Sequence, residues 1–353
     1  MNFVDPPIKV EIVPIMSKVQ IFKGNDQYYV MYELKITNGT NQTITLNSLI
    51  VQGQKSHMII NQLNNLYASI STTNLLVPEE PILGPNETGI LFLHLKTHDP
   101  KIIQNILTVN QQNLKCNPIK ISNHRPFYIN APLRGNQWMV INGFPNDGAH
   151  RRATFIVNGN IELPERFAVD LIQYGKNGLT NGDPYKNESY YSYGNVIYAA
   201  ADGVVVNKVD GIPDNIPGTS IANPTTLTIG GNFILVKINH YYVFYAHMIP
   251  NSIKVNIGDS IKVGQKIGLL GNSGSSQLPH LHFHVMKGAR PIYGPLPSPI
   301  NGQGVPWALN FTRINYTRSG QSVINEGIPI QVYPSTKQHI KDQILMNNNL
   351  VNF

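Results

Sequence analysis

The sequence predicts a mainly β protein, and three observations lead to that expectation. Turn-forming residues are frequent, with 29 glycines and 25 prolines among 353 residues, which favours many turns and few long helices. Short runs of aromatic and β-branched residues alternate with these turns. Hydrophobic residues make up 41% of the chain, enough for a sizeable core. This length suggests two domains, or one large β domain with additions.

Residues 1–125 are expected to form an immunoglobulin-like β-sandwich. Tyr28–Thr37 is rich in strand-forming residues and is followed by the turn signal Asn38-Gly39. Thr43–Val51 and Thr88–Lys96 are further predicted strands, and turns recur about every ten residues, as in small sandwiches. The histidines of this region lack metal-ligand spacing, so we expect it to supply no catalytic group.

The rest of the chain divides into three expected parts. Residues 126–139 are predicted to be a linker, residues 140–330 a second, antiparallel β domain, and residues 331–353 a C-terminal tail. Within that tail, Lys337–Leu345 is expected to form a short helix.

Charge and cysteine content narrow the class of protein. The formal net charge of +7 favours an anionic partner such as a cell envelope, but no run of Lys and Arg is dense enough to predict nucleic-acid binding. Cys116 is the single cysteine, which excludes an intrachain disulfide and a cysteine-based zinc cluster. No apolar stretch of about 18 residues predicts a transmembrane helix.

The segment Pro279–Val285 carries the strongest chemical signal, because His280, His282 and His284 recur at every second position. Side chains alternate between the two faces of a strand, so the three imidazoles share one face and the intervening apolar residues the other. Neutral imidazole is a good zinc ligand, and a catalytic zinc keeps three protein ligands and one open position.

Four further segments precede it in order: Val196–Val205, Tyr245–His247, Gly258–Gly268 and Gly271–Gly274. Together with HLHF, these segments resemble the ordered motifs of the lysostaphin-type zinc endopeptidases, also called the LytM or M23 peptidase family. The resemblance extends over about residues 140–330 and is strongest over residues 196–285.

The resemblance implies one zinc ion per chain and a role for each motif histidine. His282 is then a zinc ligand, while His247 and His280 are the catalytic pair. The family's other two ligands are a His and an Asp, usually in an H-x-x-x-D motif, which is absent here.

The candidates for these two ligands are His150 and Asp170. The turn signal Asn158-Gly159 predicts a hairpin between them, and extending its pairing places His150 opposite Phe167, three residues from Asp170. His124 is the alternative histidine.

The implied reaction is hydrolysis of a peptide bond, most readily in bacterial peptidoglycan, by a zinc-activated water with two histidines handling protons. The implied protein is exported, to the periplasm, the cell envelope or the medium; the first residues do not form a signal peptide, so we expect that signal to have been removed.

Two alternatives stay open: a non-catalytic binding or regulatory module of the same family, favoured by the long gap between His150 and Asp170, and a secreted protease that acts on proteins.

Three other residues near these motifs also carry expectations. His284 is expected to face solvent and Tyr245 to lie near the site. His240 is expected to be structural.

Overall fold

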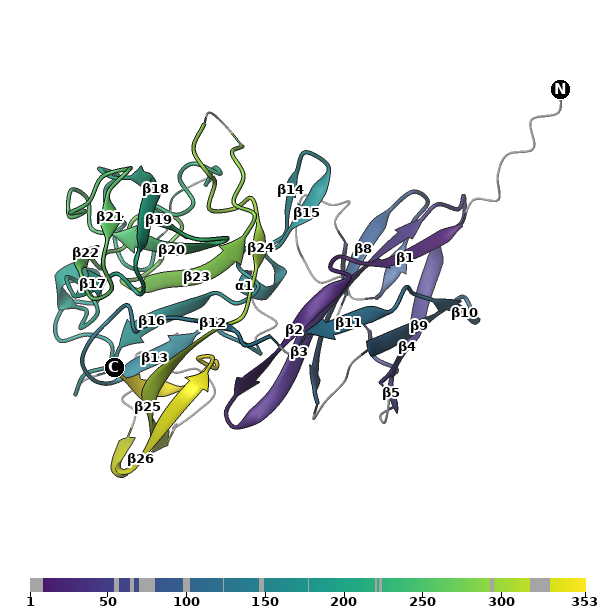
Figure 1. The fold of residues 1–353 in the computed structure, drawn as a ribbon, viewed down its shortest axis with the longest axis horizontal. Helices are drawn as coiled ribbons and strands as arrows, with labels where there is room; N and C mark the ends of the chain where they lie inside the picture. The colour runs from purple at the N-terminus through teal and green to yellow at the C-terminus, as the bar shows by residue number, and fades with distance from the viewer. Residues whose placement is uncertain are drawn as a thin grey trace. The chain divides into compact units, whose positions relative to one another are not determined.

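The computed structural model describes residues 9–53, 57–63, 67–69, 80–97, 102–122, 124–145, 149–176, 178–219, 221, 224–292, 295–317 and 331–353. The chain divides into two compact units, Met1–Pro126 and Phe127–Phe353, and strands dominate both (Figure 1). The helical segments among the described residues are α1 (Ala149–Arg152) and the 3-10 turn η1 (Asn187–Ser189). The predicted mainly β fold is therefore confirmed.

The first unit is a network of eleven strands. They are β1 (Val10–Pro14), β2 (Lys18–Gly24), β3 (Gln27–Asn38), β4 (Ile44–Gln52), β5 (His57–Ile60), β6 (Tyr67–Ser69), β7 (Ile82–Leu83), β8 (Thr88–Lys96), β9 (Ile102–Val109), β10 (Gln112–Lys115) and β11 (Ile119–Ser122). The order is β5-β4-β9-β11-β2-β3-β8-β6, with β1 beside β3, β10 beside β9 and β7 beside β4. Strand β11 joins two groups, because it pairs antiparallel with β9 and parallel with β2.

Both groups of strands bury apolar side chains in one core. Leu34 of β3 and Leu91 of β8 meet Leu49 of β4 and Leu107 of β9 there, each with no exposed surface. Cys116 is buried in the same cluster. In a β-sandwich, side chains from two groups of strands form one core, as they do here. The immunoglobulin-like topology itself stays a prediction.

The second unit is built around a twelve-stranded sheet. Its strands and those of two small hairpins are β12 (Phe127–Tyr128), β13 (Trp138–Ile141), β14 (Phe155–Val157), β15 (Asn160–Glu162), β16 (Val169–Gln173), β17 (Val196–Tyr198), β18 (Gly203–Val209), β19 (Asn232–Ile238), β20 (Tyr241–Met248), β21 (Ser260–Ile261), β22 (Lys266–Leu269), β23 (Leu281–Lys287), β24 (Gln303–Gly304), β25 (Trp307–Thr317), β26 (Gln331–Gln343) and β27 (Leu350–Asn352). The sheet order is β12-β25-β27-β13-β16-β23-β20-β19-β18-β21. Strands β14 and β15 form one separate pair, and β17 and β22 the other.

Two parts of the predicted division differ from the structure. The expected linker, residues 126–139, belongs largely to the second unit, because β12 pairs with β25 and β13 lies between β16 and β27. The expected helix Lys337–Leu345 is instead mostly strand β26, paired with β25. Local helix propensity is a weak preference that contacts with the rest of the protein can override. In this segment, strand pairing and the burial of Ile340 stabilise a strand instead of a helix. The expected boundary at residue 330 lies outside the described residues.

Gly203 and Gly268 lie in the segments that resemble the family motifs, at places where an added Cβ would come very close to other atoms. A Cβ added to Gly203 would lie 2.6 Å from Val236, and one added to Gly268 would lie 2.3 Å from Met248. The Cβ on Gly203 would also lie 2.8 Å from the backbone oxygen of Lys237, so this position needs glycine and lets β18 pack tightly against β19. At Gly268 the contact is with the end of the flexible Met248 side chain, which can shift.

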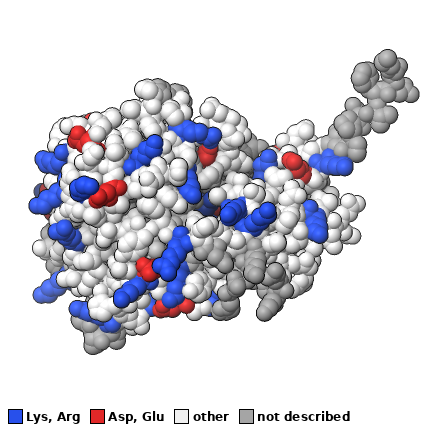
Figure 2. Space-filling model, in the orientation of Figure 1, with Lys and Arg blue, Asp and Glu red and all other residues white. Residues whose placement is uncertain are grey.

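Basic side chains do not gather in one dense patch on the face shown in Figure 2, where Lys and Arg are scattered with acidic residues among them. This agrees with the diffuse charge seen in the sequence. Among the described residues, no helix has the length and apolar character needed to cross a membrane.

Candidate metal centre and active site

Three neighbouring strands of the second sheet bring the candidate residues together. Strand β23 lies between β16 and β20, and His282 stands directly opposite Asp170 on one side and Ala246 on the other. His247 follows Ala246 at the end of β20. Because each strand is fixed by pairing on both edges, the positions of these side chains are set by sheet register.

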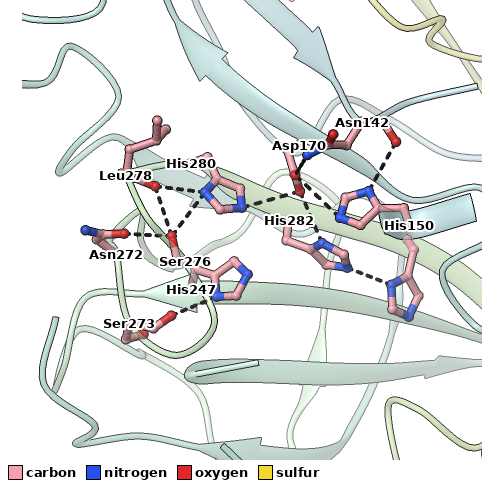
Figure 3. Close-up of polar contacts among 11 residues, drawn as sticks. Asn142, His150, Asp170, His247, Asn272, Ser273, Ser276, Leu278, His280 and His282 are labelled. Atoms are coloured by element: carbon pink, nitrogen blue, oxygen red, sulfur yellow. Dashed lines mark hydrogen bonds and ion pairs between the residues drawn. The ribbon is translucent and has the colours of Figure 1, made fainter. Parts of the chain in front are cut away.

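The carboxylate of Asp170 is the point on which three imidazoles converge (Figure 3). Its Oδ1 lies 3.1 Å from Nδ1 of His282 and 3.4 Å from Nε2 of His280. Its Oδ2 lies 3.4 Å from Nε2 of His150 and accepts a hydrogen bond of 2.7 Å from Nδ2 of Asn142. The side chain of Asp170 is only 5% exposed, so this carboxylate is almost fully buried among hydrogen-bond donors.

Backbone carbonyls fix the orientation of three of the imidazoles. Nδ1 of His150 lies 3.1 Å from the Asn142 carbonyl, and Nδ1 of His247 lies 2.7 Å from that of Ser273. Nδ1 of His280 lies 2.8 Å from the Leu278 carbonyl. A carbonyl oxygen can only accept a hydrogen bond, so each of these rings carries a proton on Nδ1, and its Nε2 is the nitrogen that can bind a metal or take up a proton.

His282 has the opposite arrangement. Its Nδ1 faces Asp170, and its Nε2 lies 3.0 Å from Nδ1 of His284. The two rings are nearly perpendicular, with an interplanar angle of 89°. The outer nitrogen of His282 therefore meets another imidazole instead of a backbone carbonyl.

The backbone of His247 is held in an unusual conformation, with a φ of 63°. Such left-handed backbone costs energy in a residue with a side chain and often marks a functional site. Its amide donates to the Gly230 carbonyl, and its carbonyl accepts from the amide of Gly271. A Cβ on Gly271 would lie 2.5 Å from the backbone nitrogen of Ile249. The Gly271–Gly274 loop can thus approach the end of β20 and present the Ser273 carbonyl to His247.

The donor set and its spacing fit zinc. Donors at about 2.0–2.2 Å from a tetrahedral zinc lie about 3.3–3.6 Å from one another. The distances of 3.1 Å from Oδ1 of Asp170 to Nδ1 of His282, and of 3.4 Å from Oδ2 of Asp170 to Nε2 of His150, are close to that range. One carboxylate and two imidazoles are also a common ligand set for catalytic zinc. By distance alone His280 could also be a metal ligand, because its Nε2 and Nδ1 of His282 both lie near Oδ1 of Asp170.

Glu165 is a nearby carboxylate that the sequence analysis missed. Its oxygen and the ring nitrogens of His150 and His282 lie within 4.8 Å of one another, close enough to hold a metal ion. It precedes β16 in a turn, with no motif spacing to mark it, so the sequence offered only its proximity to Asp170. Asn142 was missed for the same reason, because its contact with Asp170 spans two strands.

Electrostatics agree with a carboxylate that stays ionised among imidazoles. Burial raises the pKa of Asp170, but the neighbouring His150 and His280 outweigh it and hold that pKa well below its usual value. Burial lowers the pKa of His150. Burial, with help from His280, also lowers the pKa of His247 far below its usual value. The last two imidazoles are therefore neutral at pH 7, the state in which they can bind metal or accept a proton.

His150 and Asp170 lie close together, but not through an extension of the predicted hairpin about Asn158-Gly159. The hairpin itself is confirmed: β14 pairs with β15 about Asn158 and Gly159, both at positive φ. The pairing ends at Phe155 and Glu162, however, and His150 lies in the short helix α1 rather than opposite Phe167. The alternative, His124, is an exposed residue of the first unit.

Two other expectations about this strand face were wrong. His284 does not face solvent; it is 1% exposed and contacts the ring of Phe244. Tyr245 points into the core, where it packs on Phe283 and accepts a hydrogen bond from the amide of Ala200. Tyr245 does not share a face with His247, because the alternation of side chains along β20 is interrupted. Strand β20 has an irregularity opposite Asn232–Ile234, and His247 takes a positive φ. His240 is exposed in the turn before β20.

A buried carboxylate ringed by histidines is a set of donors that could hold a metal ion, and comparison with known proteins adds to this observation. Residues 189–293 match Peptidase family M23, so the chain carries an M23 peptidase domain, as the resemblance of its motifs predicted. This region contains His247, His280, His282 and His284, whereas His150 and Asp170 lie before it.

Named relatives are similar to a part of the chain of about the same length. Peptidoglycan DD-endopeptidase ShyA of Vibrio cholerae is 32% identical over 100 residues, which cover 28% of this chain and 19% of the relative. Glycyl-glycine endopeptidase ALE-1 of Staphylococcus capitis is 30% identical over 110 residues, covering 31% and 26%. The chain thus spans about a fifth to a quarter of the length of these relatives. A solved structure, the catalytic domain of lysostaphin from Staphylococcus simulans, is 21% identical with a TM-score of 0.23, covering 47% of this chain and 86% of that one.

Proposed function

We propose that the protein is an exported zinc-dependent endopeptidase that hydrolyses peptide bonds of bacterial peptidoglycan. The observation that carries the proposal is the convergence of His150, His280 and His282 on the buried carboxylate of Asp170. Such a cluster is costly to bury unless a cation or a proton transfer uses it.

His150, Asp170 and His282 are the residues that would hold the metal. The outer nitrogen of His150 is already tied to the Asn142 carbonyl, the kind of second contact that fixes the ring of a metal ligand. When bound, zinc acts as a Lewis acid that polarises a peptide carbonyl and lowers the pKa of water to about 7.

His247 and His280 are the proposed proton-handling pair. Their rings lie 4.7 Å apart between centroids, and each has its Nδ1 proton committed to a backbone carbonyl. Each Nε2 can therefore accept a proton from the attacking water and return it to the amine that leaves. The ring that carries the proton also stabilises negative charge on the carbonyl oxygen in the transition state.

The names of the relatives support peptidoglycan as the substrate class. ShyA and ALE-1 are named as endopeptidases of peptidoglycan and of glycyl-glycine bonds, and the net charge of +7 suits an anionic cell wall. The non-catalytic alternative is less favoured, because all five candidate residues belong to one buried cluster of side chains.

The test is digestion of purified peptidoglycan, with mass analysis of the soluble fragments. The zinc-loaded protein should release cross-linked or stem peptides, and a chelator should stop the release until zinc is restored. His280→Ala, which keeps the proposed ligands, is the matched control. A zinc-loaded, folded protein that releases no fragment from peptidoglycan but cleaves an unrelated protein would favour the protease alternative, and one that cleaves neither would favour the binding module.

A further inference from the structure

The second nitrogen of His282 is the unusual feature of this site. In the other three imidazoles the outer nitrogen donates to a backbone carbonyl, which leaves no choice of tautomer. His282 instead meets Nδ1 of His284 at 3.0 Å, and an imidazole can either donate or accept. The partner of Nε2 of His282 is therefore His284, while its Nδ1 faces the carboxylate of Asp170.

The surroundings of His284 favour one direction for this hydrogen bond. Its Nε2 is buried and makes no hydrogen bond within the described residues. Burial lowers the pKa of the His284 ring, and the backbone of Pro299 acts in the opposite direction. Proline has no amide proton, so that backbone can only be an acceptor. When Nδ1 of His282 binds a metal, Nε2 of His282 carries the proton of that ring, and Nδ1 of His284 at 3.0 Å must accept it, which puts the proton of His284 on its own Nε2.

With its proton on Nε2, His284 presents a lone pair at Nδ1. That lone pair accepts the Nε2 proton of His282, and the lone pair of His282 is left on Nδ1, which faces Asp170. Nδ1 is then free to bind a metal cation. Packing holds the arrangement in place, because His284 is 1% exposed and its ring centroid lies 5.0 Å from that of Phe244 on the neighbouring strand.

We propose that His284 is a positioning residue that accepts the Nε2 proton of His282 and so keeps Nδ1 of His282 available to the metal. This inference rests on the proposed function, because it takes His282 as a metal ligand. It gives a role to a histidine that the sequence analysis expected to face solvent, and it needs no contact between His284 and substrate.

Two substitutions separate the accepting atom from the packing volume. His284→Asn keeps an acceptor near the position of Nδ1, whereas His284→Leu fills a similar space and accepts nothing. Loss of such second contacts typically weakens metal affinity about 10–100-fold, so we expect the zinc dissociation constant to rise by about that factor in His284→Leu and by less than about threefold in His284→Asn. His240→Leu, in the exposed turn, is the matched control and should bind zinc like the unaltered protein.

The measurement is competition for zinc against a chromogenic chelator, with the thermal unfolding of each metal-free variant as a check on folding. The visible spectrum of the cobalt-substituted proteins should change in His284→Leu and be restored in His284→Asn. Equal zinc affinity in a folded His284→Leu would overturn the inference. If the unaltered protein binds no zinc, the proposed function fails first, and the two failures are thereby distinguished.

Nuclear magnetic resonance of the ¹⁵N-labelled, zinc-loaded protein gives an answer even if His284→Leu does not fold. Long-range proton–nitrogen correlations report which nitrogen of each ring carries the proton. We expect protons on Nε2 of both His282 and His284. A proton on Nδ1 of His284 would reverse the hydrogen bond and refute the proposed role.

Discussion

Asp170 and His282 stand directly opposite each other on β16 and β23, with Oδ1 of Asp170 3.1 Å from Nδ1 of His282. The two residues are 112 positions apart in the sequence, and only the pairing of these strands makes them neighbours. A shift of one residue in register would turn one of the two side chains to the other face of the sheet. The candidate site is therefore a direct product of the order of the strands.

The choice between Asp170 and Glu165 as the carboxylate ligand can be tested by neutral substitutions of matched size. Asp170→Asn should weaken zinc binding more than about 100-fold, which corresponds to about 2.8 kcal/mol, because it removes the anion on which the donors converge. Glu165→Gln should weaken it less than about tenfold. Zinc affinities of the two purified variants decide the matter, and the reverse order would make His150, Glu165 and His282 the ligand set.

Substitution of the motif histidines should separate catalysis from metal binding. His247→Ala and His280→Ala are expected to lower the rate of peptide hydrolysis by about 10²–10⁴-fold, the usual contribution of general acid–base groups, while zinc content stays near one per chain. His282→Ala should lose zinc. Metal analysis beside a peptide-cleavage assay checks this, and loss of zinc from His280→Ala would show that His280 is a ligand, as its distance to Asp170 alone permits.

Two glycines at similar positive φ provide a matched test of the loop that carries Ser273. Gly274 has a φ of 78° and a Cβ there would lie 2.2 Å from the backbone nitrogen of Gly231, whereas Gly218 has a φ of 86° and open space. Each alanine substitution costs about 1–2 kcal/mol in left-handed backbone, but Gly274→Ala also forces the backbone apart, at about 1–3 kcal/mol more.

We therefore expect Gly274→Ala to unfold at lower denaturant concentration than Gly218→Ala and to lose activity through the displaced Ser273 carbonyl. Urea unfolding followed by circular dichroism measures the first effect. Equal midpoints for the two variants would mean that the close approach of Gly274 to Gly231 is unimportant for stability.

The first unit is expected to supply no ligand and no catalytic group. A chain that begins at Asn123 keeps β12, the first strand of the second unit, and should bind zinc with unchanged affinity and cleave a short soluble peptide. Its activity on intact cell walls should change if the first unit positions the enzyme on its substrate. A shortened protein that folds, as judged by its circular dichroism, but binds no zinc would show that residues before Asn123 complete the site.

The sequence predicted the parts of the site that local pattern encodes. His280, His282 and His284 alternate along one strand, and Asn158-Gly159 marks a hairpin that the structure contains. The pattern could not predict burial, which depends on Phe244 of the neighbouring strand and put His284 inside the protein. It also failed at His247, whose positive φ interrupts the alternation that would have placed Tyr245 beside it.

Longer-range features were harder for the same physical reason. Residues 331–353 contain the strands β26 and β27 because these segments pair with β25 and β13, which no local propensity reveals. The approach of His150 to Asp170 depends on a short helix and on the Asn142 carbonyl, contacts that sequence spacing does not encode.

The most direct test of the account is a crystal structure of the zinc-loaded protein, with anomalous diffraction measured at the zinc absorption edge. The account predicts one zinc peak in the second unit, within about 2.0–2.2 Å of Nε2 of His150, a carboxylate oxygen of Asp170 and Nδ1 of His282. His247 and His280 should lie beside it without binding it. A zinc ion held by Glu165 with Asp170 unbound, or no zinc peak at this pocket, would contradict the account.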